Sequence, residues 1–285
     1  MVFGELSMIG FNALGSLGRL GNQMFQFAAL KGIARNRGFN YCLPPSNLYN
    51  EHTNVQQYDA EVAAGRGMHQ LFLPFNLSNT DNLNCQYLDV KRPTAVEQGF
   101  GFDENLFNRV PDWMNIHGFF QTEKYFKHIR DEIRGDFEFK DFVKDPCTEM
   151  MGSLEETPIS LHVRRTDYTT NPNHSALSLD YYKKALEEFD NETVLVFSDD
   201  PEWCGQQELF SDDRFMVAEG NSGWVDMCLM TMCKGHVIAN SSFSWWGAWL
   251  SDSEKVVAPS GWFKGSNLEA THDTKDLIPE DWIVK

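Results

Sequence analysis

The sequence has few basic residues and no long apolar run. Its 285 residues include 24 Lys and Arg against 41 Asp and Glu, which gives a net charge of −17. This balance argues against nucleic acid or an anionic membrane as the main partner, because both attract basic surfaces. No segment reaches the ~18 consecutive apolar residues of a membrane span. Residues 1–8 also lack the basic stretch that opens a signal peptide.

Cysteine is scarce and scattered. The six cysteines form no CxxC pair and no Cys/His cluster at zinc spacing. We therefore expect reduced thiols in a cytoplasmic protein and no disulfide framework. Internal repeats and low-complexity tracts are lacking as well. With 13% aromatic and 23% charged residues, the chain is globular, and its length suggests two domains.

Alternation of strands and helices is clearest in the second half. Strands are expected at 158–163, 193–197, 215–217, 236–239 and 255–258, and helices at 180–189, from 201 onward, at 224–232 and at 244–250. Alternation at this density implies a parallel sheet that helices cover on both faces.

The first half opens with a strand, a glycine-rich turn and a helix. The apolar segment 7–14 precedes glycines at 15, 18 and 21, and a wide apolar face begins near Asn22. We also expect a strand at 116–121, an amphipathic helix at 123–137 and a polar interdomain connection at 141–157. The expected domains are 1–150, which holds the glycine-rich loop 15–21, and 151–285.

Polar residues follow three of the strands expected in the second half. These are His162, Arg164, Arg165 and Asp167; then Ser198, Asp199 and Asp200; then Asn240, Ser241, Ser242 and Ser244. In a doubly wound sheet, the carboxyl ends of the strands share one edge and ligands bind there. Arginine matches phosphate geometry, carboxylates accept from purine or ribose groups, and serines before a helix suit a phosphate. The pattern predicts a site for a nucleotide diphosphate.

Structural roles compete with this interpretation. The arginines could form a surface ion pair, and Asp199 or Asp200 could simply cap the next helix. A histidine inside a strand, such as His162, is more often a core residue than a base. The tryptophans at 245, 246 and 249 favour core packing over a sugar-stacking platform. The glycine-rich loop, which is not GxGxxG, equally suits a tight turn with close helix packing.

Several ordered segments together resemble a known family. They are Gly18-Arg-Leu-Gly-Asn-Gln-Met-Phe25, Gly118-Phe-Phe-Gln-Thr-Glu-Lys-Tyr-Phe126, His162-Val-Arg-Arg-Thr-Asp167, Leu177-Ser-Leu-Asp-Tyr-Tyr182, Phe197-Ser-Asp-Asp-Pro201 and Ala239-Asn-Ser-Ser-Phe-Ser-Trp-Trp-Gly247. Their order resembles that of the α-1,2-fucosyltransferases of glycosyltransferase family 11, from about residue 14 to 261. Residues 39–115 match no segment of that pattern, and we expect acceptor specificity there.

The resemblance implies a GT-B-type α/β fold with two Rossmann-like domains and the donor site mainly on the C-terminal one. It implies GDP-fucose as donor, a galactose-terminated glycan as acceptor, and inverting transfer to form an α-1,2 linkage. No cofactor and no metal are implied. The pair Asp199-Asp200 stands before a proline and is not a DxD motif.

The resemblance also assigns roles to residues. Arg164 is expected on the β-phosphate, and Arg165 and Asp167 are expected to be needed for activity. The remaining donor-binding residues that it implies are Arg19, Asn22, His162, Asp200, Asn240, Ser241 and Ser242.

The catalytic base stays open between Asp167, His162 and Glu123, and we favour Asp167, which equally suits orienting an arginine. Two other functions also stay open. One is a GT-B transferase with another donor or linkage. The other is a catalytically silent module that binds a nucleotide or a glycan.

Overall fold

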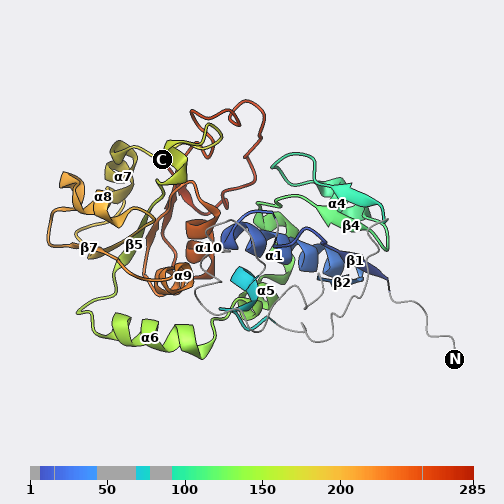
Figure 1. The fold of residues 1–285 in the computed structure, drawn as a ribbon, viewed down its shortest axis with the longest axis horizontal. Coiled ribbons are helices and arrows are strands. Elements are labelled where there is room, and N and C mark those ends of the chain that lie inside the picture. Colours follow the sequence, from blue (N-terminus) through green and yellow to red (C-terminus); the bar gives the residue numbers. More distant parts are fainter. Residues whose placement is uncertain (1–6, 16, 44–68, 78–91, 252) are drawn as a thin grey trace. The chain divides into compact units, whose positions relative to one another are not determined.

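The computed structural model describes residues 7–15, 17–43, 69–77, 92–251 and 253–285. Much of the segment 39–115, where we expect acceptor specificity, lies outside these residues. The chain divides into two compact units (Figure 1). Unit 1 comprises residues 1–138 and 273–277, and unit 2 comprises residues 139–272 and 278–285. The expected boundary at 150 therefore falls inside a helix of unit 2.

Unit 1 contains a four-stranded parallel sheet in the order β2-β1-β4-β3. Its strands are β1 (Met8–Gly10), β2 (Asn40–Cys42), β3 (Thr94–Val96) and β4 (Asn115–His117). Its α-helices are α1 (Leu20–Arg37), α3 (His69–Phe72), α4 (Glu104–Arg109) and α5 (Arg130–Asp136). Residues 273–277 belong to this unit partly through Asp276, which accepts from the backbone N–H of Phe102 at 2.9 Å and pairs with Lys124 at 2.5 Å.

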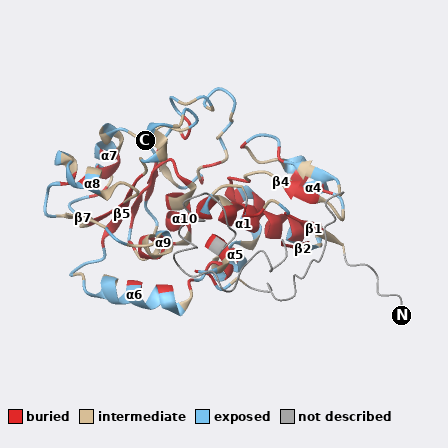
Figure 2. Cartoon of the chain, viewed as in Figure 1, coloured by how far each residue is buried: buried red, intermediate tan, exposed pale blue. Residues whose placement is uncertain are grey.

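Helix α1 fills the middle of unit 1. Most of its side chains are buried, as the wide apolar face predicts (Figure 2). It ends where Gly38 adopts a left-handed conformation, with φ 66°, and donates to the carbonyls of Ala34 and Arg35. Lys31 is buried inside the unit, and its charge is neutralised by Asp136 at 2.5 Å.

The helix expected at 123–137 is interrupted. The structure has two 3₁₀ turns, η3 (Glu123–Tyr125) and η4 (Lys127–Ile129), before α5. At Phe126 the backbone leaves the helical region, with φ −137° and ψ 2°. Tyr125 and Phe126 are neighbours, and both are wholly buried. The break allows two adjacent aromatic rings to be buried together.

Unit 2 contains a six-stranded parallel sheet in the order β10-β9-β8-β5-β6-β7. Its strands are β5 (Ile159–Val163), β6 (Val194–Ser198), β7 (Phe215–Val217), β8 (His236–Val237), β9 (Val256–Ala258) and β10 (Ile283–Val284). The first five were predicted, and β10 was not. The two parallel sheets confirm the predicted α/β class with two Rossmann-like units.

The helices of unit 2 are α6 (Asp141–Gly152), α7 (Leu179–Leu186), α8 (Pro201–Gly205), α9 (Gly223–Thr231) and α10 (Ser242–Leu250), with the 3₁₀ turns η5 (Asp167–Thr169) and η6 (Glu208–Phe210). Helix α6 packs on α9. The core of the unit joins the apolar strands to α7, with Leu161 and Tyr182 wholly buried in it. Trp245, Trp246 and Trp249 are buried on α10 and contact one another, so they pack the core instead of forming a sugar platform.

The interdomain connection expected at 141–157 was wrong in its first part, because residues 141–152 form α6. Only Val143 and Cys147 of this helix are buried, and most of its surface is exposed (Figure 2). It also contains Pro146. A narrow apolar stripe with a proline inside it carries little helical signal in the sequence.

Candidate active site

The polar residues predicted at three strand ends do lie at one edge of the second sheet. Strands β5, β6 and β8 are parallel neighbours, with β5 in the centre. From β5 the chain continues to β6 and β7 on one side, and then crosses to β8 on the other side. The order of the strands reverses between β5 and β8, which is where doubly wound sheets bind their ligands.

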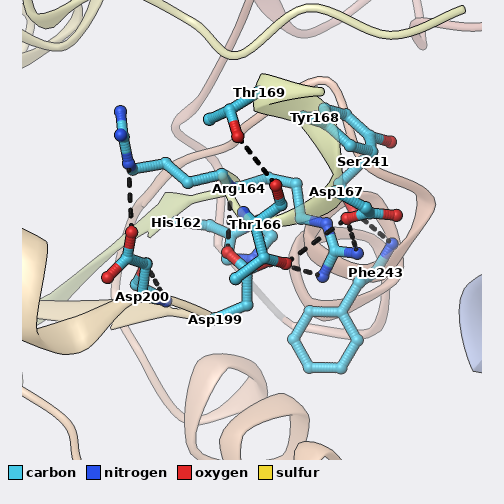
Figure 3. A network of polar contacts seen from close by, with 12 residues as sticks. His162, Arg164, Thr166, Asp167, Tyr168, Thr169, Asp199, Asp200, Ser241 and Phe243 are labelled. Atoms are coloured by element: carbon cyan, nitrogen blue, oxygen red, sulfur yellow. Dashed lines mark hydrogen bonds and ion pairs between the residues drawn. The ribbon is translucent and has the colours of Figure 1, made fainter. Parts of the chain in front are cut away.

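Arg164 stands just past the end of β5, and two carboxylates hold it. One guanidinium nitrogen lies 3.1 Å from Asp199, and another pairs with Asp167 (Figure 3). The ring of Tyr168 lies 5.3 Å from the guanidinium carbon. The side chain is 16% exposed, so the charge is fixed in place but still reaches the surface.

Arg165 points to a different carboxylate. Its Nε donates to Asp200 at 3.3 Å, and its guanidinium stacks on the ring of Trp203 at 3.7 Å. Asp200 also caps α8 by accepting from the backbone N–H of Trp203 at 3.3 Å. The capping role is thus real for Asp200, and the same side chain orients Arg165.

Asp199 is a central residue of this network; the strand-end pattern includes it, but the family resemblance gives it no role. Its carboxylate accepts from the backbone N–H groups of Arg165 and Thr166 at 2.8 and 3.1 Å, and from the Thr166 hydroxyl. Burial acts to raise the pKa of Asp199, but Arg164 and these hydrogen bonds outweigh it and lower that pKa. In the sequence, the only indication of this role is that Asp199 stands next to Asp200 in Ser198-Asp199-Asp200.

His162 joins β5 to α10. It is 5% exposed, and its Nδ1 lies 2.9 Å from the hydroxyl of Ser244. Burial, with the charge of Arg164, lowers the pKa of His162 to about 3. The imidazole is therefore neutral at physiological pH and is a poor base. Ser244, to which the family resemblance gave no role, therefore links α10 to β5.

Asn240 ties loops together. Its Nδ2 donates to the carbonyls of Ser175 and Trp262, both at 3.0 Å, so both amide hydrogens are used inside the protein. The backbone carbonyl of Asn240 accepts from the hydroxyl of Tyr168 at 3.2 Å. The buried Oδ1 has no hydrogen-bond partner among the described residues. These bonds make Asn240 a structural link between the loops after β5, β8 and β9.

Ser241 and Ser242 begin α10. The hydroxyl of Ser241 accepts from the N–H of Phe243 at 3.4 Å, which caps the helix, and Ser242 is its first residue. Figure 3 shows Ser241 and Phe243 in the same network as Arg164 and Asp167. The positive end of a nine-residue helix thus starts beside the arginine, an arrangement that suits an anionic group.

Arg19 and Asn22, the other two predicted donor-binding residues, belong to unit 1. Arg19 is the exposed N-cap of α1, and Asn22 lies in the first turn of that helix. Gly18 precedes them with φ 84°, a conformation that favours glycine, and a Cβ there would strike the Asn22 side chain. The glycine pattern therefore marks a turn with close packing at a helix N-terminus.

Glu123, one of the three candidate bases, is also in unit 1. It is 6% exposed and pairs with Lys127 at 2.8 Å.

Among the described residues, no group of three or more His, Cys, Asp and Glu side chains is placed to hold a metal ion. Within the same part of the chain, every helix is too short or too polar to cross a bilayer.

Together, the sheet order and the charged residues at its switch point define an α/β protein of the doubly wound class. The sequence matches the model of glycosyl transferase family 11 over residues 5–284. It is 30% identical to an α-1,2-colitosyltransferase of Escherichia coli, over 93% of this chain and 96% of that protein. It is 23% identical to a galactoside 2-α-L-fucosyltransferase of Bos taurus, over 96% of this chain and 73% of that protein.

The chain therefore belongs to glycosyl transferase family 11 and is a glycosyltransferase. The predicted family is confirmed. Among solved structures, an α-1,6-fucosyltransferase, NodZ, soaked with GDP-fucose matches with a TM-score of 0.47 at 13% identity, over 87% of this chain and 93% of that one.

Proposed function

We propose that this enzyme transfers L-fucose from GDP-β-L-fucose to the 2-hydroxyl of a galactose residue at the end of a glycan, with inversion at the anomeric carbon. The observation that carries the proposal is Arg164, fixed between Asp167 and Asp199 at the switch point of the sheet, in a chain of this family. Relatives with α-1,2 in their names support the linkage.

In this reaction the galactose oxygen attacks C1 of fucose, and the bond from C1 to the β-phosphate oxygen breaks. GDP leaves with the electron pair, and the hydroxyl proton passes to a base or to water. Negative charge grows on the β-phosphate as the bond breaks. Arg164, already in place, stabilises that charge more than it stabilises the intact donor, which is what lowers a barrier.

The neighbouring groups have supporting roles in this proposal. The start of α10, with Ser241 and Ser242, adds N–H and hydroxyl donors for the diphosphate. We assign Asp200 to binding the guanine. Arg165, which pairs with Asp200, is assigned to orienting that carboxylate. We assign Asp167 to orienting Arg164, because its carboxylate is already engaged by that guanidinium. The low pKa of His162, about 3, argues against it as the base.

A second donor sugar should be tested together with GDP-fucose. The similarity to a colitosyltransferase favours a closely related sugar, colitose, which is L-fucose without its 3-hydroxyl group. The linkage and the leaving group are the same for both donors. The roles proposed for Arg164, Ser241 and Ser242 are therefore independent of which sugar is transferred.

The experiment is a donor and acceptor panel with EDTA present. Purified enzyme is incubated with GDP-fucose, GDP-colitose or GDP-mannose and galactose-terminated oligosaccharides, and the products are analysed by mass and linkage. We expect an α-1,2-fucosylated product that forms without a divalent metal. Faster transfer from GDP-colitose than from GDP-fucose would mean that colitose is the sugar transferred. Binding of GDP without any transfer would favour the silent module, and no binding of any GDP-sugar would refute the proposal.

A further inference from the structure

The proton of the attacking hydroxyl has no assigned acceptor in the proposed reaction. His162 is buried and a poor base, and Asp167 is engaged by Arg164. Another titratable group of unit 2 lies close to these residues and has no role in the proposed reaction. His174 is in the loop that follows η5, and its ring is stacked on the ring of Tyr168, with 4.4 Å between the centroids and 7° between the planes.

The ring of Tyr168 links His174 to Arg164. The guanidinium carbon of Arg164 lies 5.3 Å from the centroid of that ring, so the imidazole and the guanidinium both contact one aromatic side chain. Figure 3 shows Tyr168 in the network of Arg164 and Asp167. In an inverting displacement, the attacking oxygen and the leaving oxygen lie on opposite sides of C1. A group that stands one ring away from the arginine on the leaving phosphate is therefore suited to meet the attacking hydroxyl.

Hydrogen bonds fix the loop that carries His174. The N–H of His174 donates to the carbonyl of Asn171 at 3.1 Å, and the N–H of Asn171 donates to the carbonyl of Asp167 at 2.9 Å. On the other side, the carbonyl of Ser175 accepts from the side chain of Asn240 at 3.0 Å. The position of the imidazole is thus set from the ends of β5 and β8 before any ligand binds, as a preorganised catalytic group requires.

The ring of His174 is able to accept a proton. Neither ring nitrogen has a hydrogen-bond partner within the described ranges, and neither is sealed off from solvent. Burial lowers the pKa of His174 below its ordinary value of 6.5, against the raising effect of Asp167, and Arg164 lowers it further. The other ring contact is Phe263, behind which lies His272. The imidazole is therefore neutral near pH 7, and the carboxylate of Asp167 stabilises the imidazolium ion once it forms.

We propose that His174 is the catalytic base, which takes the proton of the acceptor 2-hydroxyl as that oxygen attacks C1 of the donor sugar. This inference rests on the proposed function. An electron pair of the oxygen forms the new bond to C1, the pair of the bond from C1 to the phosphate leaves with GDP, and the proton goes to a ring nitrogen. The imidazolium ion then releases the proton to water.

The test compares His174→Phe with the wild-type enzyme. Phenylalanine keeps a ring on Tyr168 and removes the nitrogens, so a role in packing alone would survive the change. We expect kcat for transfer to a galactose-terminated oligosaccharide to fall about a hundredfold or more, with a Kd for GDP close to that of wild type. His272→Gln is the matched control and should keep wild-type turnover, because His272 lies behind Phe263 and its Nδ1 is 2.7 Å from the hydroxyl of Thr271.

Azide separates proton removal from positioning. The azide ion attacks C1 without losing a proton, so the formation of a fucosyl azide needs no base. His174→Phe should form this product as fast as wild type does, whereas Arg164→Ala should lose both reactions.

The pH profile gives a second readout. The kcat/KM of the wild-type enzyme should fall with decreasing pH below 6.5, as His174 gains its proton, and this fall should be absent from His174→Phe. Neither the diphosphate of the donor nor a neutral galactoside titrates in this range, so the substrates do not produce the fall.

Three results would overturn the inference while the proposed function stands. They are wild-type kcat in His174→Phe, equal losses of galactose and azide transfer in that variant, and a pH profile that the substitution leaves unchanged. Melting temperatures report whether the variants fold, and His174→Gln replaces His174→Phe if the latter does not. If the wild-type enzyme transfers no sugar from any GDP-sugar, the proposed function fails, and this inference fails with it.

Discussion

Glu97→Gln should make the enzyme more stable at alkaline pH. Glu97 is 7% exposed, and burial raises its pKa from 4.5 to about 7, against the lowering effect of hydrogen bonds from Phe120, Tyr125 and Phe119. The folded chain therefore binds this proton more tightly than the unfolded chain. The stabilisation is complete below pH 4.5 and is lost as the pH rises to about 7.

The size of the effect follows from the shift. From 4.5 to about 7 is about 2.5 pH units, and at 1.36 kcal/mol per unit this is roughly 3 kcal/mol at full ionisation. Glutamine has the shape of the protonated side chain. Its oxygen accepts from Phe119 and Phe120, and its nitrogen faces the hydroxyl of Tyr125, which lies 3.2 Å from Oε1 of Glu97. The variant keeps the bonds from Phe119 and Phe120, reverses the bond with Tyr125, whose hydroxyl accepts from the new amide nitrogen, and no longer titrates.

The assay is thermal unfolding of both proteins at pH 5 and pH 8. We expect similar melting temperatures at pH 5, and at pH 8 a variant that melts several degrees higher. Glu104→Gln, on the exposed surface of α4, is the control and should show little change between the two pH values. A stability difference between Glu97→Gln and wild type that is the same at both pH values would refute the assigned pKa and its cause.

Other predictions concern the site and its supports. Arg164→Ala should lower turnover by roughly a hundredfold or more in a protein that still folds, and Arg164→Lys should restore little, because lysine lacks the planar fork; wild-type turnover would remove Arg164 from the mechanism. Asp199→Asn should destabilise the protein by about 1–3 kcal/mol in chemical denaturation and lower kcat, because an amide has one acceptor oxygen where Asp199 uses two, Oδ1 for the N–H of Arg165 and Oδ2 for Thr166 and Arg164; no change in either quantity would contradict its central place. Gly18→Ala should cost about 1–2 kcal/mol of stability from the left-handed backbone alone, plus the clash with Asn22; an alanine variant as stable as wild type would contradict that geometry.

The sheet of unit 2 was predictable because its strands are short, apolar and separated by helices. Parallel topology then places their carboxyl ends at one edge, and this brings His162, Arg164 and Asp200 together without any knowledge of contacts. The strand β10 was missed because it is two residues long and pairs at the edge of the sheet. Its sequence contains no alternation to recognise.

Hydrogen-bond partners were less predictable than positions. Asp199 and Asp200 are adjacent and chemically identical, and only the three-dimensional structure distinguishes the one that accepts from the N–H of Arg165 from the one that caps α8. Asn240 was predicted as a ligand residue, but its amide hydrogens bind loop carbonyls from Ser175 and Trp262. Such contacts depend on residues that are far apart in the sequence.

The charges at the switch point affect donor binding and catalysis differently in the proposed reaction. Two guanidinium groups, from Arg164 and Arg165, are matched by three carboxylates, from Asp167, Asp199 and Asp200. A site with that balance does not attract a diphosphate strongly through net charge. In the proposed reaction, the site offers a guanidinium whose direction is fixed before the donor arrives, so little reorganisation is needed as charge develops on the leaving group. Weak attraction for the donor with strong stabilisation of the leaving phosphate raises the rate more than tight binding of both states would.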